Sequence, residues 1–264
     1  MASDYQPFDW YETPLYYDAV FDPGSDAEAD FVTGVYHRYR SADGKRRLLE
    51  PACGTGRLVR ALAGRGFAVT GFDLSEPSLR FARRRCAELA LEPMPELVQG
   101  RMESFRFRRK FDLAYCLVST FKYLPDEDAA RSHLECVARA LYRGGIYALG
   151  LHITDYTDQR RQRERWVAER DGRRIVCNIQ SWPADRRRRT EQLRARFTVD
   201  EDGATRRFET RWTFRTYDLE QLERLLASVP ALEHVATHDF DYRLERETPF
   251  DGRRLDVLLI LRRR

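Results

Sequence analysis

One stretch of sequence decides the fold: LLEPACGTGRLVRALAGRGFAVTGFD, which runs from Leu48 to Asp73. A short apolar run at residues 47–52 leads into a turn that is rich in glycine, and helix-forming residues follow at 58–63. A second apolar run at residues 67–73 ends in an aspartate. Strand, glycine turn, helix and strand in this order predict a crossover unit of a parallel sheet.

The same alternation continues along the first half of the chain. Short apolar runs predict further strands, and amphipathic stretches predict helices between them. Ser75 is suited to cap the helix that follows the second strand. The further strands are expected at residues 96–99, 111–118 and 146–153, and the helices at 75–89 and 126–141, the latter ended by Arg143-Gly144-Gly145.

After residue 155 the pattern changes to one typical of antiparallel strands. From about Trp166 to Arg215, apolar residues alternate with arginine and threonine. Asp171-Gly172 and Asp202-Gly203 supply turn signals between the runs. We therefore expect three or four antiparallel strands inserted into the α/β fold, which then resumes with a helix at 218–227 and strands at 232–240 and 255–261.

Charge and composition narrow the choice of partners. The chain has 46 basic and 42 acidic residues and a net charge of +4. Such a balance attracts nucleic acid only weakly, so the arginine runs at 106–110 and 186–189 are interpreted as solvated faces, and nucleic acid is not the expected partner.

Location and metal content are also predicted from composition. The apolar runs are much shorter than the roughly 18 residues of a membrane span, and the acidic, aromatic N-terminal stretch is unlike a secretory signal. We expect a cytoplasmic protein without a membrane segment. The five cysteines form no CxxC pair, so neither a disulfide framework nor a metal site is expected.

The glycine turn now permits a family comparison. The segment LLEPACGTGRLVRALAGRGFAVTGFDLSEPSLRFARRR resembles the first two motifs of class I S-adenosylmethionine-dependent methyltransferases. FDLAYCLVSTFKYL and LYRGGIYALGLHI resemble the later motifs, so the match runs from about residue 43 to 153. The resemblance implies S-adenosylmethionine as cofactor, S-adenosylhomocysteine as product, and methyl transfer to nitrogen or oxygen of a small-molecule acceptor.

The family's fold gives the predicted architecture. It is a Rossmann-like, seven-stranded, mostly parallel sheet with helices on both faces, a terminal antiparallel hairpin, and an antiparallel insertion after the fifth strand. Residues 1–40 would form an aromatic N-terminal cap, and 41–160 with 216–264 the cofactor-binding domain. Residues 161–215 would form the insertion, as a lid over the acceptor or a contact between two copies in a homodimer.

The resemblance also carries cofactor contacts to individual residues. It implies that the glycine turn holds the methionine part of the cofactor, that Glu50 orients the turn, and that Asp73 binds the ribose. Leu74 would form one wall of the adenine site. The turn residues concerned are Ala52, Cys53, Gly54, Gly56 and the adjoining Arg57.

The remaining cofactor contacts come from the later motifs. Met102 matches the apolar residue that closes the adenine site, but Arg101 stands at the position usually acidic, so Glu103 is the candidate to replace it. Cys116 and Leu117 would approach the sulfonium region through their backbone. Tyr16 is the candidate from the aromatic cap.

A dinucleotide-binding enzyme is the nearest rival. It would carry GxGxxG, in which the third glycine allows close packing of the helix. Here Arg57 and Leu58 follow Gly56, and no third glycine stands in register. The methyltransferase interpretation is therefore favoured over a dinucleotide oxidoreductase.

Two residues are candidates for chemistry at the acceptor. His152 follows the fifth strand, where the crevice of such a sheet opens, and imidazole is the commonest general base. Tyr17 of the aromatic cap is the second candidate, and Asp155 would be tested next. The placement of the insertion is similar to that of amino-sugar and glycine-type N-methyltransferases. An RNA-directed enzyme and a non-catalytic cofactor-binding protein remain the alternatives.

Overall fold

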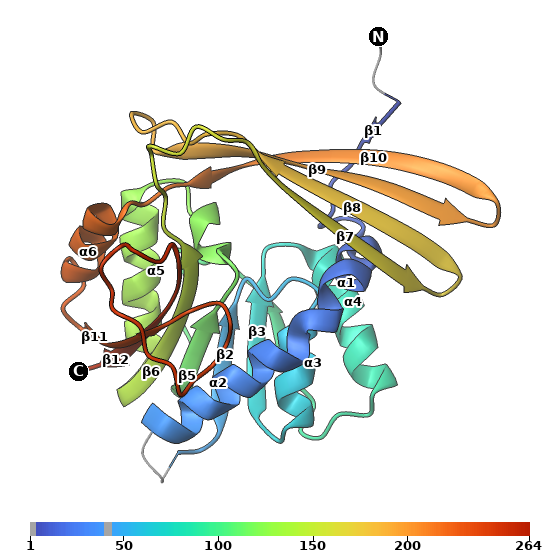
Figure 1. Ribbon diagram of the computed structural model, residues 1–264. Coiled ribbons are helices and arrows are strands. Elements are labelled where there is room, and N and C mark those ends of the chain that lie inside the picture. Colours follow the sequence, from blue (N-terminus) through green and yellow to red (C-terminus); the bar gives the residue numbers. More distant parts are fainter. Residues whose placement is uncertain (1–3, 40–43) are drawn as a thin grey trace.

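The computed structural model describes residues 4–39 and 44–264, which form two β-sheets and six α-helices within that part of the chain (Figure 1). The larger sheet has seven strands in the order β11-β12-β6-β5-β2-β3-β4. They are β2 (Arg47–Pro51), β3 (Ala68–Asp73), β4 (Glu96–Gln99), β5 (Phe111–Cys116), β6 (Leu141–His152), β11 (Leu232–His238) and β12 (Asp256–Arg263).

Six of these strands run in the same direction, and β12 alone runs against them. The pairs β2–β3, β2–β5, β3–β4 and β5–β6 are all parallel. Strand β12 is antiparallel to both β6 and β11. The predicted mostly parallel sheet is therefore confirmed, and its antiparallel strand lies next to one edge.

Helices cover both faces of this sheet, as expected. One face packs against α2 (Ser25–Tyr39), α3 (Arg57–Gly64) and α4 (Glu76–Glu88). The other packs against α5 (Glu127–Ala140) and α6 (Leu219–Ala227). Because both faces are buried, the central strands are almost wholly apolar, and all six residues of β5 are buried.

Local sequence signals explain where several helices begin. Ser75 caps α4, since its hydroxyl accepts a hydrogen bond from the Ser78 amide. Asp126 caps α5 in the same way. Asp218 and Gln221 form a reciprocal capping box at the start of α6.

The second sheet has the order β1-β10-β9-β8-β7 and lies across the top of the view in Figure 1. The predicted antiparallel insertion of three or four strands is present, and it has four strands after residue 160. Both aspartate-glycine pairs have positive φ at each residue, as a two-residue hairpin requires. The strands are β7 (Gln162–Arg170), β8 (Arg173–Ser181), β9 (Thr190–Glu201) and β10 (Ala204–Arg215), with β1 (Gln6–Pro7) added in parallel to β10.

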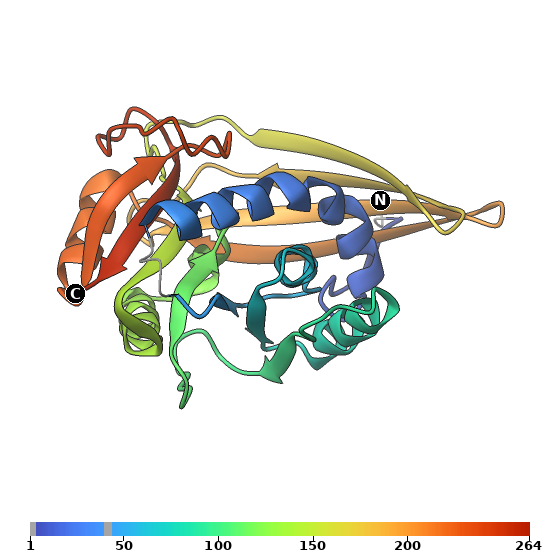
Figure 2. The ribbon, with the colours of Figure 1, turned by 90° about the horizontal axis from the view of Figure 1, so that it is seen from below.

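This inserted sheet is connected to the large sheet at the carboxyl end of the parallel strands. The chain leaves the large sheet after His152, at the end of β6, and returns at Tyr217, whose carbonyl accepts a bond from the Thr154 amide. Helix α1 (Pro14–Phe21), which the short 3-10 helix η1 (Asp22–Gly24) follows, contacts β7 and β8. It lies beneath these strands in Figure 1 and in front of the sheet in Figure 2, which is seen from below. The insertion therefore stands over the edge where a parallel sheet binds ligands.

One predicted boundary is wrong. The glycines Gly144 and Gly145 do not end a helix, because α5 stops at Ala140 and β6 begins at the next residue. A Cβ on Gly145 would lie 2.8 Å from the Tyr142 carbonyl oxygen, so close backbone contact within the strand explains that glycine.

Two further sequence expectations concern membranes and cysteines. Within the described residues, no helix is long and apolar enough to cross a bilayer. All five cysteines are free and buried, so the core uses them as small apolar side chains.

Candidate active site

The glycine turn is fixed by the carboxylate of Asp73. The Gly54 amide donates to Asp73 Oδ2 at 2.7 Å, and the Ser75 amide donates to Oδ1 at 2.8 Å. Burial raises the pKa of Asp73, and these two amide bonds oppose the rise. Because turn and carboxylate share a bond, the two positions that the sequence singled out form one structural unit.

Gly54 and Gly56 are required for different reasons. Both have positive φ, at 51° and 70°. A Cβ on Gly56 would lie 2.9 Å from the Ala82 Cβ, so this glycine lets α3 pack against α4. A Cβ on Gly54 would meet no protein atom within 4 Å. The side of the turn at Gly54 is therefore open to a ligand.

Glu50 lies behind the turn in a buried position, as expected. Its Oε2 accepts a hydrogen bond from the Tyr115 hydroxyl at 2.9 Å. Burial raises the pKa of Glu50 to about 8, although nearby Arg57 and the bond from Tyr115 lower it. A carboxyl group of this kind changes charge near neutral pH and is sensitive to any cation placed beside it.

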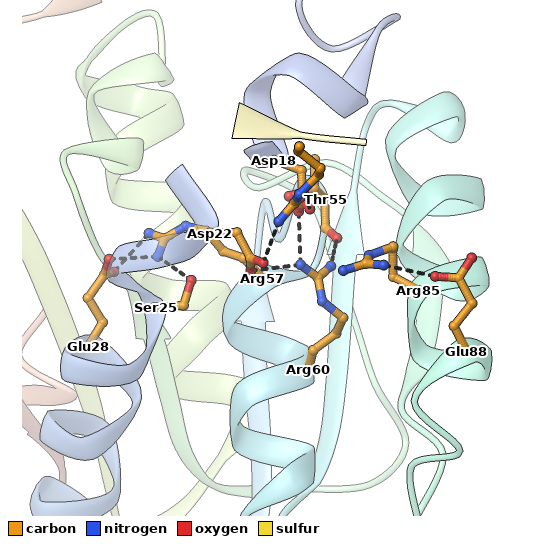
Figure 3. Close-up of polar contacts among 10 residues, drawn as sticks. Asp18, Asp22, Ser25, Glu28, Thr55, Arg57, Arg60, Arg85 and Glu88 are labelled. Atoms are coloured by element: carbon orange, nitrogen blue, oxygen red, sulfur yellow. Dashed lines mark hydrogen bonds and ion pairs between the residues drawn. The ribbon is translucent and has the colours of Figure 1, made fainter. Parts of the chain in front are cut away.

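Arg57, the first residue of α3, directs its guanidinium to helix α2. Its two terminal nitrogens bind both carboxylate oxygens of Glu28, at 2.6 and 2.8 Å, and one also binds the Ser25 hydroxyl (Figure 3). Figure 3 also shows Arg57 and Glu28 meeting between the two helices. The Arg57 side chain is therefore engaged with α2.

The expected adenine wall has one exposed and one buried residue. Leu74 is 60% exposed, which is unusual for leucine, and its carbonyl accepts a bond from the Gln99 amide group. Met102 is buried against the core. Glu103, the proposed substitute for the missing acid, forms an ion pair with Arg101 at 2.5 Å.

A buried hydrogen-bond chain holds Met102 and was not predicted. His133 of α5 is fully buried, and burial lowers its pKa to about 4, so the ring is neutral. Its Nδ1 must donate to the Met102 carbonyl, at 3.0 Å. Its Nε2 therefore accepts from the Tyr147 hydroxyl, at 2.8 Å. This chain fixes the loop after β4 to strand β6.

The chain turns sharply after β5, at Val118 and Ser119. Both residues have positive φ, at 54° and 62°, a conformation that a β-branched residue rarely adopts. The Ser119 hydroxyl accepts a bond from the His152 amide at 2.9 Å. The predicted contacts Cys116 and Leu117 are both buried at this edge.

His152 is held by a partner from the far end of the chain. Its Nδ1 lies 2.8 Å from Asp256 Oδ1, and its side chain is 44% exposed. When Nδ1–H donates a hydrogen bond to this carboxylate, a neutral ring carries its accepting lone pair at Nε2. Asp155, the reserve candidate, is exposed and accepts bonds from Thr157 in its own turn.

The two tyrosines of the cap have different surroundings. Tyr16 is buried among Phe8 and Phe208, and Arg206 of β10 donates to its hydroxyl. Tyr17 lies near the glycine turn, where the fields of Arg57, Glu28, Asp73 and Glu50 act on it and burial raises its pKa. Adjacent residues of a helix face different sides, and the sequence did not reveal which of the two faces the turn.

Five aromatic rings join the cap, the loop after β5 and the inserted sheet. Trp10 packs on Trp212 at 4.5 Å between ring centroids, and Trp212 lies 6.0 Å from Phe214. Phe214 contacts Tyr123 at 4.7 Å, and Tyr123 meets Tyr11 at 6.1 Å. The ring centroids of Trp10 and Tyr11 lie 5.7 Å apart, so the five rings form a closed series of contacts. We call these five residues the aromatic belt.

A buried lysine stands beside the belt and was also missed. Lys122 is 2% exposed, pairs with Glu191 at 3.2 Å and lies over the Phe214 ring. Burial lowers its pKa, while Glu191 and Asp256 oppose that effect. No local pattern in the sequence distinguishes this lysine from a surface one.

Known proteins match this arrangement. Residues 48–145 match the family model described as a methyltransferase domain. The cypemycin N-terminal methyltransferase of a Streptomyces species is 31% identical over 228 residues, which cover 85% of this chain and 86% of that one. The chain belongs to the methyltransferase family.

Solved structures show that the fold is shared over the whole chain. An S-adenosylmethionine-dependent methyltransferase from Clostridium acetobutylicum ATCC 824 aligns with a TM-score of 0.73 and 20% identity, covering 96% of this chain and 98% of that one. The S-adenosylmethionine-bound amino pentose methyltransferase CalS10 from Micromonospora echinaspora aligns with a TM-score of 0.70 and 21% identity, covering all of both chains. Both share the methyltransferase fold.

Proposed function

We propose that this methyltransferase transfers a methyl group from S-adenosylmethionine to an amine nitrogen of a small molecule. The observation that carries the proposal is the His152–Asp256 pair at the carboxyl end of β6, 2.8 Å apart and adjacent to the turn after β5. An oriented imidazole is of use where the acceptor must lose a proton during transfer. The alternative acceptor atom is the oxygen of a hydroxyl group.

The glycine turn fits the cofactor in two respects. Open space stands where Gly54 would carry a Cβ, and the buried carboxylate of Asp73 stands beside it. Asp73, Gly54 and the backbone around Cys53 would hold the sugar and amino-acid parts, and Leu74 and Met102 the base. When bound, S-adenosylmethionine supplies an electrophilic methyl group that an in-line nucleophile can take.

The chain's own residues then have distinct tasks. The aromatic belt and Tyr17 would exclude water from the acceptor site, in the manner of a lid. His152 Nε2 would take the proton that the amine loses, and Asp256 would stabilise the charged ring through Nδ1. The inserted sheet supplies two of the belt residues, Trp212 and Phe214, which supports its proposed role as a cover for the acceptor.

Two relatives favour nitrogen over oxygen. The cypemycin enzyme is named as an N-terminal methyltransferase. A second relative, from Streptomyces fradiae, acts on the amine of an amino sugar by its name and is 33% identical over 99 residues, although these are only 38% of this chain. We therefore propose an amine, in preference to a hydroxyl group, as the methyl acceptor.

A two-stage experiment tests the proposal. Calorimetry with S-adenosylhomocysteine should give a heat of binding for the purified protein. A panel of small amines, hydroxyl compounds and total RNA should then be incubated with labelled S-adenosylmethionine. Transfer of label to an amine is expected, in amounts that change little as salt rises. Labelled RNA, with binding that falls steeply with salt, would favour the RNA-directed alternative instead.

We propose that residues 161–215 cover the acceptor site and that the outward face of this sheet is available to a second copy in a homodimer. Light scattering of the purified protein measures the second point. A monomer at all concentrations would leave the cover as the only role of the insertion.

A further inference from the structure

A buried network of ion pairs joins three parts of the molecule (Figure 3). Arg60 of α3 donates through Nη2 to Asp18 of α1 at 2.9 Å and to Asp22 of η1 at 2.8 Å. Arg170 at the end of β7 donates to the other oxygens of the same carboxylates, at 2.6 and 3.1 Å. We call Asp18, Asp22, Arg60 and Arg170 the ion square.

Two members of the ion square are deeply buried, whereas Asp22 and Arg170 are 25% and 22% exposed. The side chain of Asp18 is fully buried and that of Arg60 is 5% exposed. Two negative and two positive charges balance, and each carboxylate binds both guanidinium groups. Removing one member leaves a buried charge short of a partner, which is strongly unfavourable. The ion square therefore links the cap, the inserted sheet and α3 to one another.

Arg60 also reaches the glycine turn. Its Nη1 donates to the Thr55 carbonyl at 2.7 Å, one residue after the amide of Gly54 that binds Asp73. The turn is thus held from two sides, by Asp73 at an amide and by Arg60 at a carbonyl. One guanidinium group contacts both the turn and the acids that anchor the cap.

We propose that Arg60 and Asp18 are positioning residues for cofactor binding, which couple the docking of the aromatic cap and the inserted sheet to the shape of the glycine turn. This inference rests on the proposed function, because it takes the glycine turn to be the cofactor site. None of the four side chains needs to touch the cofactor. Their effect passes through the Thr55 carbonyl and through the position of Tyr17, which is on α1 one residue before Asp18.

The coupling has to act in both directions. If a docked cap improves the cofactor site, then a bound cofactor must stabilise the docked cap by the same factor. Two independent measurements therefore report on one quantity. The first is the affinity for cofactor, and the second is the protection of the α1 amides against hydrogen exchange.

The test uses Arg170→Gln, which cuts the hairpin of the inserted sheet from the square and leaves Arg60 in place. S-adenosylhomocysteine binding to the full chain is measured by calorimetry, and exchange of the α1 amides is measured with and without this ligand. The dissociation constant should rise about tenfold, the scale of typical coupling between sites. Ligand-induced protection of α1 should fall in parallel. Arg170→Lys keeps the charge but not the planar guanidinium that bridges two carboxylates. Its dissociation constant should therefore lie between those of the wild type and Arg170→Gln.

Arg65→Gln is the matched control. Arg65 adjoins the end of the same helix α3 and pairs with Asp26 and Asp30, whose side chains are 87% and 71% exposed. This variant makes the same charge change without touching the square, and its dissociation constant should stay within about twofold because exposed pairs contribute little. Failure of the wild-type protein to bind would overturn the proposed function. If the wild type binds S-adenosylhomocysteine and Arg170→Gln binds it with the same affinity and the same protection of α1, the coupling alone would be overturned.

Arg60→Gln serves as the second variant. It should weaken binding more than Arg170→Gln does, because it removes the contact with the Thr55 carbonyl as well. If it does not fold, as judged by circular dichroism, the decision rests on Arg170→Gln, whose side chain is 22% exposed and whose loss leaves the α/β core intact.

Discussion

His152 and Asp256 are 104 residues apart in the chain and hydrogen-bonded in the fold, with Nδ1 of the ring 2.8 Å from a carboxylate oxygen. They are directly paired partners of the antiparallel strands β6 and β12. The pairing places both side chains at the carboxyl edge of the sheet. It also orients the ring, because the Asp256 carboxylate engages Nδ1 and leaves Nε2 as the other ring nitrogen.

The first prediction concerns this pair. His152→Gln should lower kcat about a hundredfold, the usual contribution of a general base, with the Michaelis constant for the cofactor unchanged. Asp256→Asn should lower kcat by about tenfold, because the ring loses its orienting acceptor. His37→Gln, a change at an exposed histidine of α2, is the control. Unchanged turnover in His152→Gln with an accepted amine would return this histidine to a packing role.

The second prediction separates the two glycines of the turn. Gly54→Ala should fold, and its free energy of unfolding should fall by about 1 kcal/mol because alanine is strained at a positive φ. It should fail to bind S-adenosylhomocysteine, because the new methyl group enters the open space beside the turn. The free energy of unfolding of Gly56→Ala should fall further, by about 1–3 kcal/mol, because the new methyl group overlaps Ala82. Thermal unfolding and calorimetry measure the two effects. Normal binding by Gly54→Ala would show that the open side of the turn is not the cofactor site.

The third prediction concerns Asp73. Asp73→Asn keeps the shape of the side chain but removes the charge that two amides and the ribose hydroxyls would share. Binding of S-adenosylhomocysteine should weaken by about 1–3 kcal/mol, because a polar ligand group is left without its acceptor. Asp30→Asn, at an exposed position of α2, is the control. Equal affinity in both variants would remove Asp73 from the ribose site.

The fourth prediction concerns pH. Burial raises the pKa of Glu50 from 4.5 to about 8, so the folded protein retains a proton that the unfolded chain releases. The stability gained from this group is complete below about pH 4.5 and is lost as the pH rises through about 8. Without cofactor, the melting temperature of the wild type should therefore fall more steeply over that range than that of Glu50→Gln. Glu135→Gln on the exposed face of α5 should behave as the wild type does, and identical slopes for all three proteins would contradict the prediction.

Much of the fold is determined by patterns that extend over only a few residues. Strand, turn and helix signals placed β4 at its observed bounds, residues 96–99, and the two aspartate-glycine pairs at the hairpin turns. The same is true of Asp73 at the end of β3. These features follow from backbone conformation and from burial on one or two faces, which neighbouring residues dictate. The wrong helix end arose because a glycine needed for close backbone contact within a strand, Gly145, looks the same in the sequence as one that ends a helix.

The sequence by itself determined the parallel sheet, the glycine turn with its acid, and the antiparallel insertion. Only the tertiary structure decided which distant side chains meet: Asp256 with His152, Arg170 with Asp18, and Tyr17 rather than Tyr16 beside the turn. The physical reason is that such contacts depend on strand register and on the rotation of a helix about its axis. A shift of one residue in either turns every side chain to another face, and no local pattern records that choice.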